Sequence, residues 1–154
     1  MFEDYERLAR LEEIAEGMFY RLWLWSKIKD LLATITGRRR DLLFISRSDG
    51  TDVPFETLPT HPIRVEQIKG SIGRADRFDR EWMPRQRRDK DRWVGVAVAM
   101  MADTTQLPPV NVVQLDDVYY INDGHHRVSA ARALGKIYVD ANVTCWKISS
   151  DSAC

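Results

Sequence analysis

A short run near the C-terminus, Asp123-Gly124-His125-His126-Arg127, combines residue types that bind anions. A strand pattern ends before this run and a helix pattern begins within it, which places the run at a helix start. The first turn of a helix has backbone N–H groups without intrahelical partners, and the helix dipole adds positive charge there. Gly124 lets an anion approach the backbone, and Arg127 can hold a phosphate through two parallel N–H bonds. The run therefore predicts a phosphate site, to which His125 and His126 add side-chain donors.

Other polar side chains are expected to complete this site. Ser129 and Arg132 follow on the same helix and are expected to line the same phosphate site. Arg74 is expected to fold over the bound phosphates. Magnesium is expected to bind through the phosphates and one carboxylate, with Asp123 as the candidate ligand. If the protein catalyses phosphotransfer or nucleotide hydrolysis, Asp123 or Asp79 is the candidate to orient the metal or the attacking hydroxyl.

A purely structural interpretation of the same run stays open. Asp123 can cap the N-terminus of the helix, and Gly124 can serve only the turn. A zinc site is not expected, because the adjacent His125 and His126 diverge on a helix. The chain holds two cysteines and three histidines, and these have no spacing that would complete a zinc ligand shell.

The helix that follows this run belongs to an α/β (α+β) pattern, a small mixed sheet with helices. Strands are expected from Ile63 to Gly70 and at 110–115, 118–121 and 138–143, and helices at 89–102 and 125–134. The run 42–45 is compatible with a further helical turn. The chain then divides into an N-terminal helical extension at 1–40, a linker at 41–60, a nucleotide-binding domain at 61–148 and a flexible tail at 149–154.

Residues 3–36 are predicted to form one long helix, because apolar side chains recur every three or four residues. A continuous helix of this length would extend about 50 Å at about 1.5 Å per residue. Its aromatic side chains face more than one side, so the helix must be covered by other protein. They are Phe19, Tyr20, Trp23 and Trp25. We expect self-association, most simply a homodimer through this helix.

Charge and composition restrict the partners. Lys+Arg and Asp+Glu both number 23, so the net charge of zero predicts neither nucleic acid nor a membrane as partner. The most apolar stretch, 18–32, contains four charged residues and is not expected to span a bilayer. The first residues are acidic where a signal peptide would be basic. We expect a cytoplasmic protein without a membrane partner.

The stretch 74–92 is rich in arginine, with eight basic and five acidic side chains and a net charge of +3. A nucleic-acid surface would need these arginines on one face. A solvated loop with internal ion pairs is the simpler interpretation. A third is that Arg74 or Arg77 folds over a nucleotide.

The sequence Asp-Gly-His-His-Arg-Val-Ser-Ala-Ala-Arg at 123–132, followed by a glycine at 135, resembles the signature of ParB-like domains. That superfamily includes ParB, sulfiredoxin and archaeal free-serine kinases, which share a small α/β fold. Their Gly-x-x-Arg turn at a helix start holds nucleotide phosphates. Residues 63–68 resemble the first strand of these domains, and 107–110 the Leu-Pro-Pro-Val that opens the hairpin. The resemblance covers residues 61–146, leaves out the N-terminal helix, and implies a nucleotide ligand such as ATP, ADP or CTP.

Some departures limit what the resemblance implies. His125 stands where sulfiredoxin has its cysteine nucleophile, so that reaction is not expected. The serine kinases use a carboxylate shortly after the first strand, where this chain has Ser71, with Asp76 and Asp79 further on. ParB's helix-turn-helix domain, which reads DNA, is not expected here.

Three functions are compatible with the sequence. The first is a nucleotide-binding domain with phosphotransferase or nucleotide-hydrolysing activity. The second is a DNA-associated regulatory module in which nucleotide switches dimerisation. The third is a non-catalytic interaction protein that has kept the fold.

Overall fold

The computed structural model of the 154-residue chain describes residues 2–44, 55–73, 76–103 and 106–146. Within them the helices are α1 (Phe2–Thr36), α2 (Lys90–Ala102) and α3 (His125–Ala133), with the short 3-10 helices η1 (Val65–Gln67) and η2 (Arg87–Asp89). The strands are β1 (Leu43–Phe44), β2 (Phe55–Thr57), β3 (His61–Arg64), β4 (Ile68–Ser71), β5 (Val110–Leu115), β6 (Val118–Asp123) and β7 (Tyr138–Trp146).

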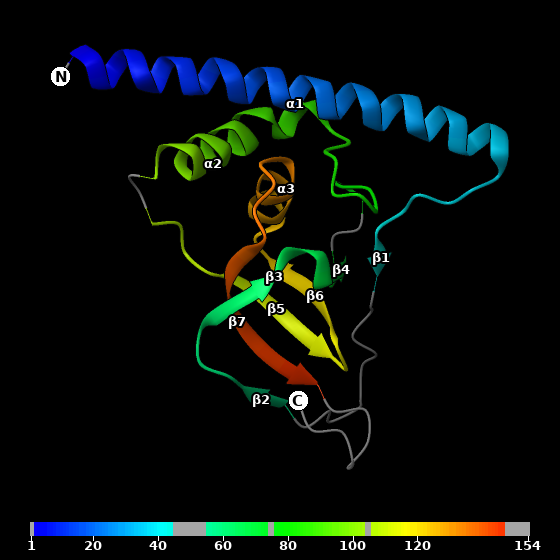
Figure 1. The fold of residues 1–154 in the computed structure, drawn as a ribbon. Helices are drawn as coiled ribbons and strands as arrows, with labels where there is room; N and C mark the ends of the chain where they lie inside the picture. The colour runs from blue at the N-terminus through cyan, green and yellow to red at the C-terminus, as the bar shows by residue number, and fades with distance from the viewer. Residues whose placement is uncertain (1, 45–54, 74–75, 104–105, 147–154) are drawn as a thin grey trace.

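All seven strands form one mixed sheet in the order β1-β4-β6-β5-β7-β2, with β3 also paired to β7. The β5–β6 hairpin is antiparallel, whereas β4 runs parallel to β6 and β5 runs parallel to β7. The helices lie together on one side of the strands in Figure 1, with α2 between α1 and α3. The expected small mixed sheet with helices, preceded by a long N-terminal helix, is confirmed.

The long N-terminal helix is continuous, as its apolar spacing predicts. Gly17 does not interrupt it, and Glu3 and Asp4 in its first turn complement the positive end of the helix dipole. Gly37 follows the last helical residue with φ +68°, the left-handed conformation in which helices commonly stop. No helix in the described part of the chain is both long and apolar enough to cross a membrane.

Three local expectations differ from the structure. The predicted strand from Ile63 to Gly70 is two strands, because η1 interrupts it and redirects the chain from β7 to β6. The run 42–45 is not helical where it is described, since Leu43 pairs with Gly70 in a parallel bridge. The expected linker 41–60 therefore contributes two sheet edges, β1 and β2.

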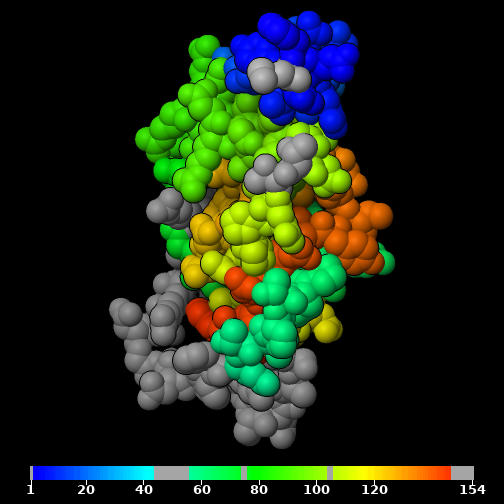
Figure 2. Space-filling model, turned by 90° about the vertical axis from the view of Figure 1, so that its left-hand side faces the viewer, coloured from blue at the N-terminus to red at the C-terminus, as the bar shows by residue number. Residues whose placement is uncertain are grey.

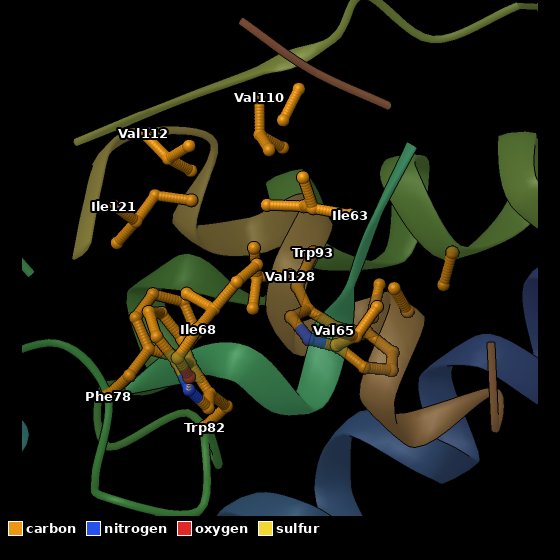
Figure 3. Close-up of a cluster of buried hydrophobic side chains, with 14 of the residues drawn as sticks. Ile63, Val65, Ile68, Phe78, Trp82, Trp93, Val110, Val112, Ile121 and Val128 are labelled. Atoms are coloured by element: carbon orange, nitrogen blue, oxygen red, sulfur yellow. Dashed lines mark hydrogen bonds between the residues drawn. The ribbon is translucent and has the colours of Figure 1, made fainter. Parts of the chain in front are cut away.

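The core lies between the sheet and α2, and α1 contributes to it. Phe19 of α1 is fully buried, and its ring centroid lies 5.8 Å from that of Trp93 on α2. Figure 3 shows the side chains of Phe78 and Trp82 beside Ile68, whose carbonyl oxygen accepts the Trp82 indole N–H at 3.3 Å. Burying such side chains is the main source of folding free energy. The extension and the sheet thus share one hydrophobic cluster.

Candidate anion-binding site

The turn between β6 and α3 has the geometry expected of an anion site. Gly124 is the N-cap residue of α3, with φ +106°, and no side chain caps the helix there. The first backbone bond of the helix runs from the N–H of Val128 to the carbonyl of Gly124 at 3.0 Å. The N–H groups of 126 and 127 also precede it and have no intrahelical acceptor. These donors lie at the positive end of the helix dipole.

Gly124 is also required for packing. A Cβ atom at this position would lie 2.7 Å from Cγ1 of Val110 and 3.1 Å from a guanidinium nitrogen of Arg127. A side chain would therefore clash with strand β5 and would close the approach to the backbone.

A cavity of about 480 Å³ opens in front of this turn. Its wall consists of the loop after β4, of Arg77, of Arg92 and Val96 on α2, and of residues 122–127. Three arginines line it, whereas Asp123 is the one carboxylate among its described lining residues. The cavity therefore favours an anionic ligand.

Arg127, the residue expected to clamp phosphate, is engaged within the protein. One of its guanidinium nitrogens donates to the carbonyl oxygens of Pro108 and Pro109, the latter at 2.8 Å. The other donates to Oδ2 of Asp123 at 2.8 Å. The side chain is only 13% exposed. Arg127 thus fixes the segment before β5 against α3, and Asp123 accepts from Arg127 rather than capping the helix.

The cationic wall opposite the turn is formed by Arg77 and Arg92. Arg77 donates to Oδ1 of the buried Asp89 at 3.3 Å. Arg92 is exposed, and no ion pair is formed by it among the described residues. Sequence reasoning missed Arg92. Its spacing of four from Val96 places both on one face of α2, but this does not distinguish Arg92 from the other arginines of the stretch 74–92.

The two histidines at the start of α3 point into different surroundings. Nε2 of His125 lies 2.6 Å from the hydroxyl oxygen of Ser71, and both side chains are buried. The His125 ring also stacks on Phe78. This residue therefore joins the end of β4 to the start of α3.

His126 is buried at the base of the cavity, beside Asp89. Its Nε2 lies 3.7 Å from Oδ1 of Asp89, beyond hydrogen-bond distance. Within the described residues, neither this nitrogen nor Oδ2 of Asp89 has a hydrogen-bond partner. Burial lowers the pKa of His126 below 6.5; Asp89 opposes the change, and Arg92 and Arg77 add to it. His126, which lines the cationic cavity, and the neighbouring Asp89 therefore each have one buried polar atom without a partner among the described residues.

The remaining expected site residues have structural roles elsewhere. Ser129 accepts the indole N–H of Trp93 at 2.8 Å and donates to the carbonyl of Trp82 at 2.6 Å. Arg132 donates to the carbonyls of Val65 and Ile68, both at 3.1 Å, and burial lowers its pKa. Neither side chain lines the cavity. Arg74 lies outside the described residues.

Asp79 is not at the cavity either. It is fully buried, and its Oδ2 accepts from Arg40 at 2.6 Å. Its Oδ1 accepts the backbone N–H groups of Glu81 and Met83, both at 2.9 Å. These bonds occupy the carboxylate, so Asp79 organises the 79–83 loop against α1 and is not available to orient a metal or a hydroxyl.

Several charges of the arginine-rich stretch are paired within the chain. Arg85 donates to Asp41 at 2.9 Å and to Asp30 at 3.3 Å, and Lys90 donates to Glu16 at 2.6 Å. The Arg77–Asp89 pair lies within the stretch, whereas these other partners lie outside it. Phe78, Asp79 and Trp82 are buried, so the expectation of a solvated loop with internal ion pairs is wrong in part.

Comparison with known proteins gives little sequence similarity. No family model matches the chain, and no curated protein matches its sequence. Among solved structures, the chain is similar to sulfiredoxin from Arabidopsis thaliana, with 20% sequence identity and a TM-score of 0.41. The similar region covers 56% of this chain and 84% of that one.

Proposed function

We propose that the cavity at the start of α3 binds the phosphate groups of a nucleotide. The observation that carries this proposal is the uncapped first turn of α3, entered at Gly124 and faced by Arg92 and Arg77 across the cavity. Backbone N–H groups at a helix start and guanidinium groups both bind phosphate in proteins.

The role of Arg127 in this proposal differs from the one expected from the sequence. Its guanidinium is bound to two carbonyl oxygens and a carboxylate, so it supports the turn and does not provide the main cation. Arg92 takes that place, because it lines the cavity and is exposed. Arg77 is a second contact whose charge is shared with Asp89.

A nucleotide is proposed as the ligand because the run 123–127 resembles the phosphate turn of ParB-like domains, and ATP, ADP and CTP are the first candidates. Magnesium would bind through the phosphates and Asp123. The Asp123 carboxylate lines the cavity and is 62% exposed, which fits a ligand that shares the ion with phosphate and water. Among the described residues there is no cluster of three His, Cys, Asp or Glu that would hold a metal on its own.

The decisive experiment is isothermal titration calorimetry with ATP, ADP, CTP and pyrophosphate, each with and without magnesium. Arg92→Ala is expected to weaken binding tenfold or more, since a charge-assisted hydrogen bond contributes about 1.5–3 kcal/mol. Arg88→Ala is the matched control, because Arg88 is also exposed and lies just before α2 but does not line the cavity. Equal affinity of the Arg92 and Arg88 variants would remove the site assignment.

Two further results would change the assignment. Binding of DNA with a steep decrease at rising salt, and no nucleotide binding, would favour the DNA-associated alternative. Absence of any melting shift with nucleotides or pyrophosphate would favour a protein that has kept the fold without the ligand.

The unaltered protein with ATP and magnesium can also be assayed for nucleotide hydrolysis. If ATP is hydrolysed, Asp123→Asn is expected to reduce the rate with magnesium, since Asp123 is the described carboxylate that lines the cavity. Asp79 is not part of this proposal, because its carboxylate is occupied by Arg40 and two backbone N–H groups.

A further inference from the structure

Helix α1 has a band of large apolar side chains on its C-terminal half, here called the outer stripe. Its six members are between 40% and 74% exposed: Leu24, Trp25, Ile28, Leu31, Leu32 and Ile35. At 3.6 residues per turn these positions fall within an arc of about 120°. Contiguous exposed apolar surface of this kind marks an interaction site in most proteins.

The opposite face of the same helix is the one that packs on the rest of the chain. Ser26 and Ala33 are buried there, and Asp30 accepts from Arg40 and Arg85, each at 3.3 Å. Figure 1 shows α1 at the outer edge of the molecule, with α2 and the rest of the chain on one side of it. The outward face of α1 is therefore more apolar than the inward face beside it, which is unusual for a surface helix.

The spacing within the outer stripe is that of a paired helix. Leu24, Ile28, Leu31 and Ile35 follow one another at intervals of four, three and four residues. This is the d-a-d-a order of a heptad pattern, with leucine at d and isoleucine at a, the combination that favours two helices. Trp25 and Leu32 stand at the neighbouring e positions and widen the contact.

The area of the outer stripe reaches the lower limit for a dimer interface. An aromatic side chain such as that of Trp25 has about 150–250 Å² of surface, and leucine and isoleucine have somewhat less. Complete burial of the exposed half would remove at most about 100 Å² from each residue, or at most about 1,200 Å² from two copies. That upper value lies at the lower limit for specific protein interfaces. A two-fold axis suits such a contact, because the same patch then serves both partners.

Charges beside the outer stripe do not favour a membrane surface instead. Lys29 is ion-paired with Glu81, and Arg40 lies on the inward face, where it pairs with Asp30 and Asp79. Lys27 is exposed beside the outer stripe, but one such lysine does not make a basic face. A membrane-surface helix needs a basic polar face that anionic headgroups can reach.

From these observations we infer that the outer stripe is the interface through which two copies of this chain pair, helix α1 against helix α1. No residue of the outer stripe lines the anion cavity, so the inference does not rest on the proposed nucleotide binding.

Sedimentation equilibrium of the full chain, over a wide concentration range, tests the inference. The unaltered protein is expected to form a dimer, and Leu31→Lys is expected to raise its dissociation constant at least tenfold, since each dimer would bury two lysines. Thr34→Lys is the matched control, because Thr34 is exposed on the same helix but outside the outer stripe. It should dimerise like the unaltered chain.

Circular dichroism and thermal unfolding establish that each variant is folded; Ile35→Lys, at a position 74% exposed, replaces Leu31→Lys if that variant is not. A monomer at every concentration would overturn the inference, and so would equal dimerisation of the Leu31 and Thr34 variants. Binding to vesicles of phosphatidylcholine and phosphatidylserine is the last measurement. A chain that is monomeric in solution but binds these vesicles through the outer stripe would show a lipid surface as the partner.

Discussion

The hydroxyl oxygen of Ser71 lies 2.6 Å from Nε2 of His125, and this hydrogen bond joins the last residue of β4 to the first residue of α3. Both side chains are buried, so the bond is shielded from water. The position of the α3 start relative to the sheet, and hence the shape of the anion cavity, depends on it.

We predict that Ser71→Ala lowers the free energy of unfolding by about 1–3 kcal/mol, since a buried hydrogen-bonding group then loses a partner. Urea denaturation measures the change. Ser26→Ala is the control, because Ser26 is equally buried but its hydroxyl has no hydrogen-bond partner among the described residues. If both variants lose the same stability, the bond between Ser71 and His125 contributes nothing specific.

His126 is predicted to make stability depend on pH. Its folded-state pKa is lowered from 6.5 because burial disfavours the charged ring, so the unfolded chain binds more protons between the two values. The free energy of unfolding should therefore decrease as the pH falls below about 7 through this window. His126→Gln should remove this part of the slope, whereas His61→Gln should retain it. Identical pH profiles for the two variants would contradict the assignment to His126.

Arg127 is predicted to stabilise the fold mainly through the carbonyl groups before β5. Arg127→Ala leaves the carbonyls of Pro108 and Pro109 without their donor, at a cost of about 1–3 kcal/mol. Asp123→Ala should cost less than about 1 kcal/mol, because the carboxylate is 62% exposed and water screens the ion pair. Urea denaturation measures the free energy of unfolding of both variants. Equal decreases would mean that the ion pair with Asp123 contributes most of the stabilisation.

Gly124 is predicted to tolerate no side chain. In Gly124→Ala the new Cβ would lie 2.7 Å from Cγ1 of Val110, at a φ of +106° that other residues rarely adopt. We expect a loss of more than about 1 kcal/mol, from left-handed strain and from this clash. Adding Val110→Ala should relieve the clash, so the double variant should lose less than the sum of the two single variants. Strictly additive losses would show that the contact is unimportant.

Periodic patterns predicted most of the fold. Strands β5, β6 and β7 and helices α1, α2 and α3 lie within a few residues of the expected positions, because apolar spacing and turn residues are local signals. The division at η1 was not predicted, since Ile63, Val65 and Ile68 are consistent with the apolar positions of one short strand. The division into β3 and β4 depends on their strand partners, β7 and β6, which lie far along the chain.

The candidate site was only partly predictable for the same reason. Gly124 could be placed at a helix start from the sequence alone. The carbonyl partners of Arg127 come from 18 and 19 residues earlier, and the Arg40 partner of Asp79 comes from 39 residues earlier, so no local pattern could show these contacts. The ion pair of Arg127 with Asp123, four residues earlier, is the part that local spacing could indicate. Arg92 reaches the cavity only because α2 packs between α1 and α3.

The packing of α1 on α2 has a consequence for any shortened form of this protein. Phe19 contacts Trp93, the residue next to Arg92, and Glu16 accepts from Lys90 at the start of α2. A fragment that begins after α1 would expose the indole of Trp93 to water and leave α2 poorly supported. Such a truncation should aggregate, so α1 is needed for a stable fragment.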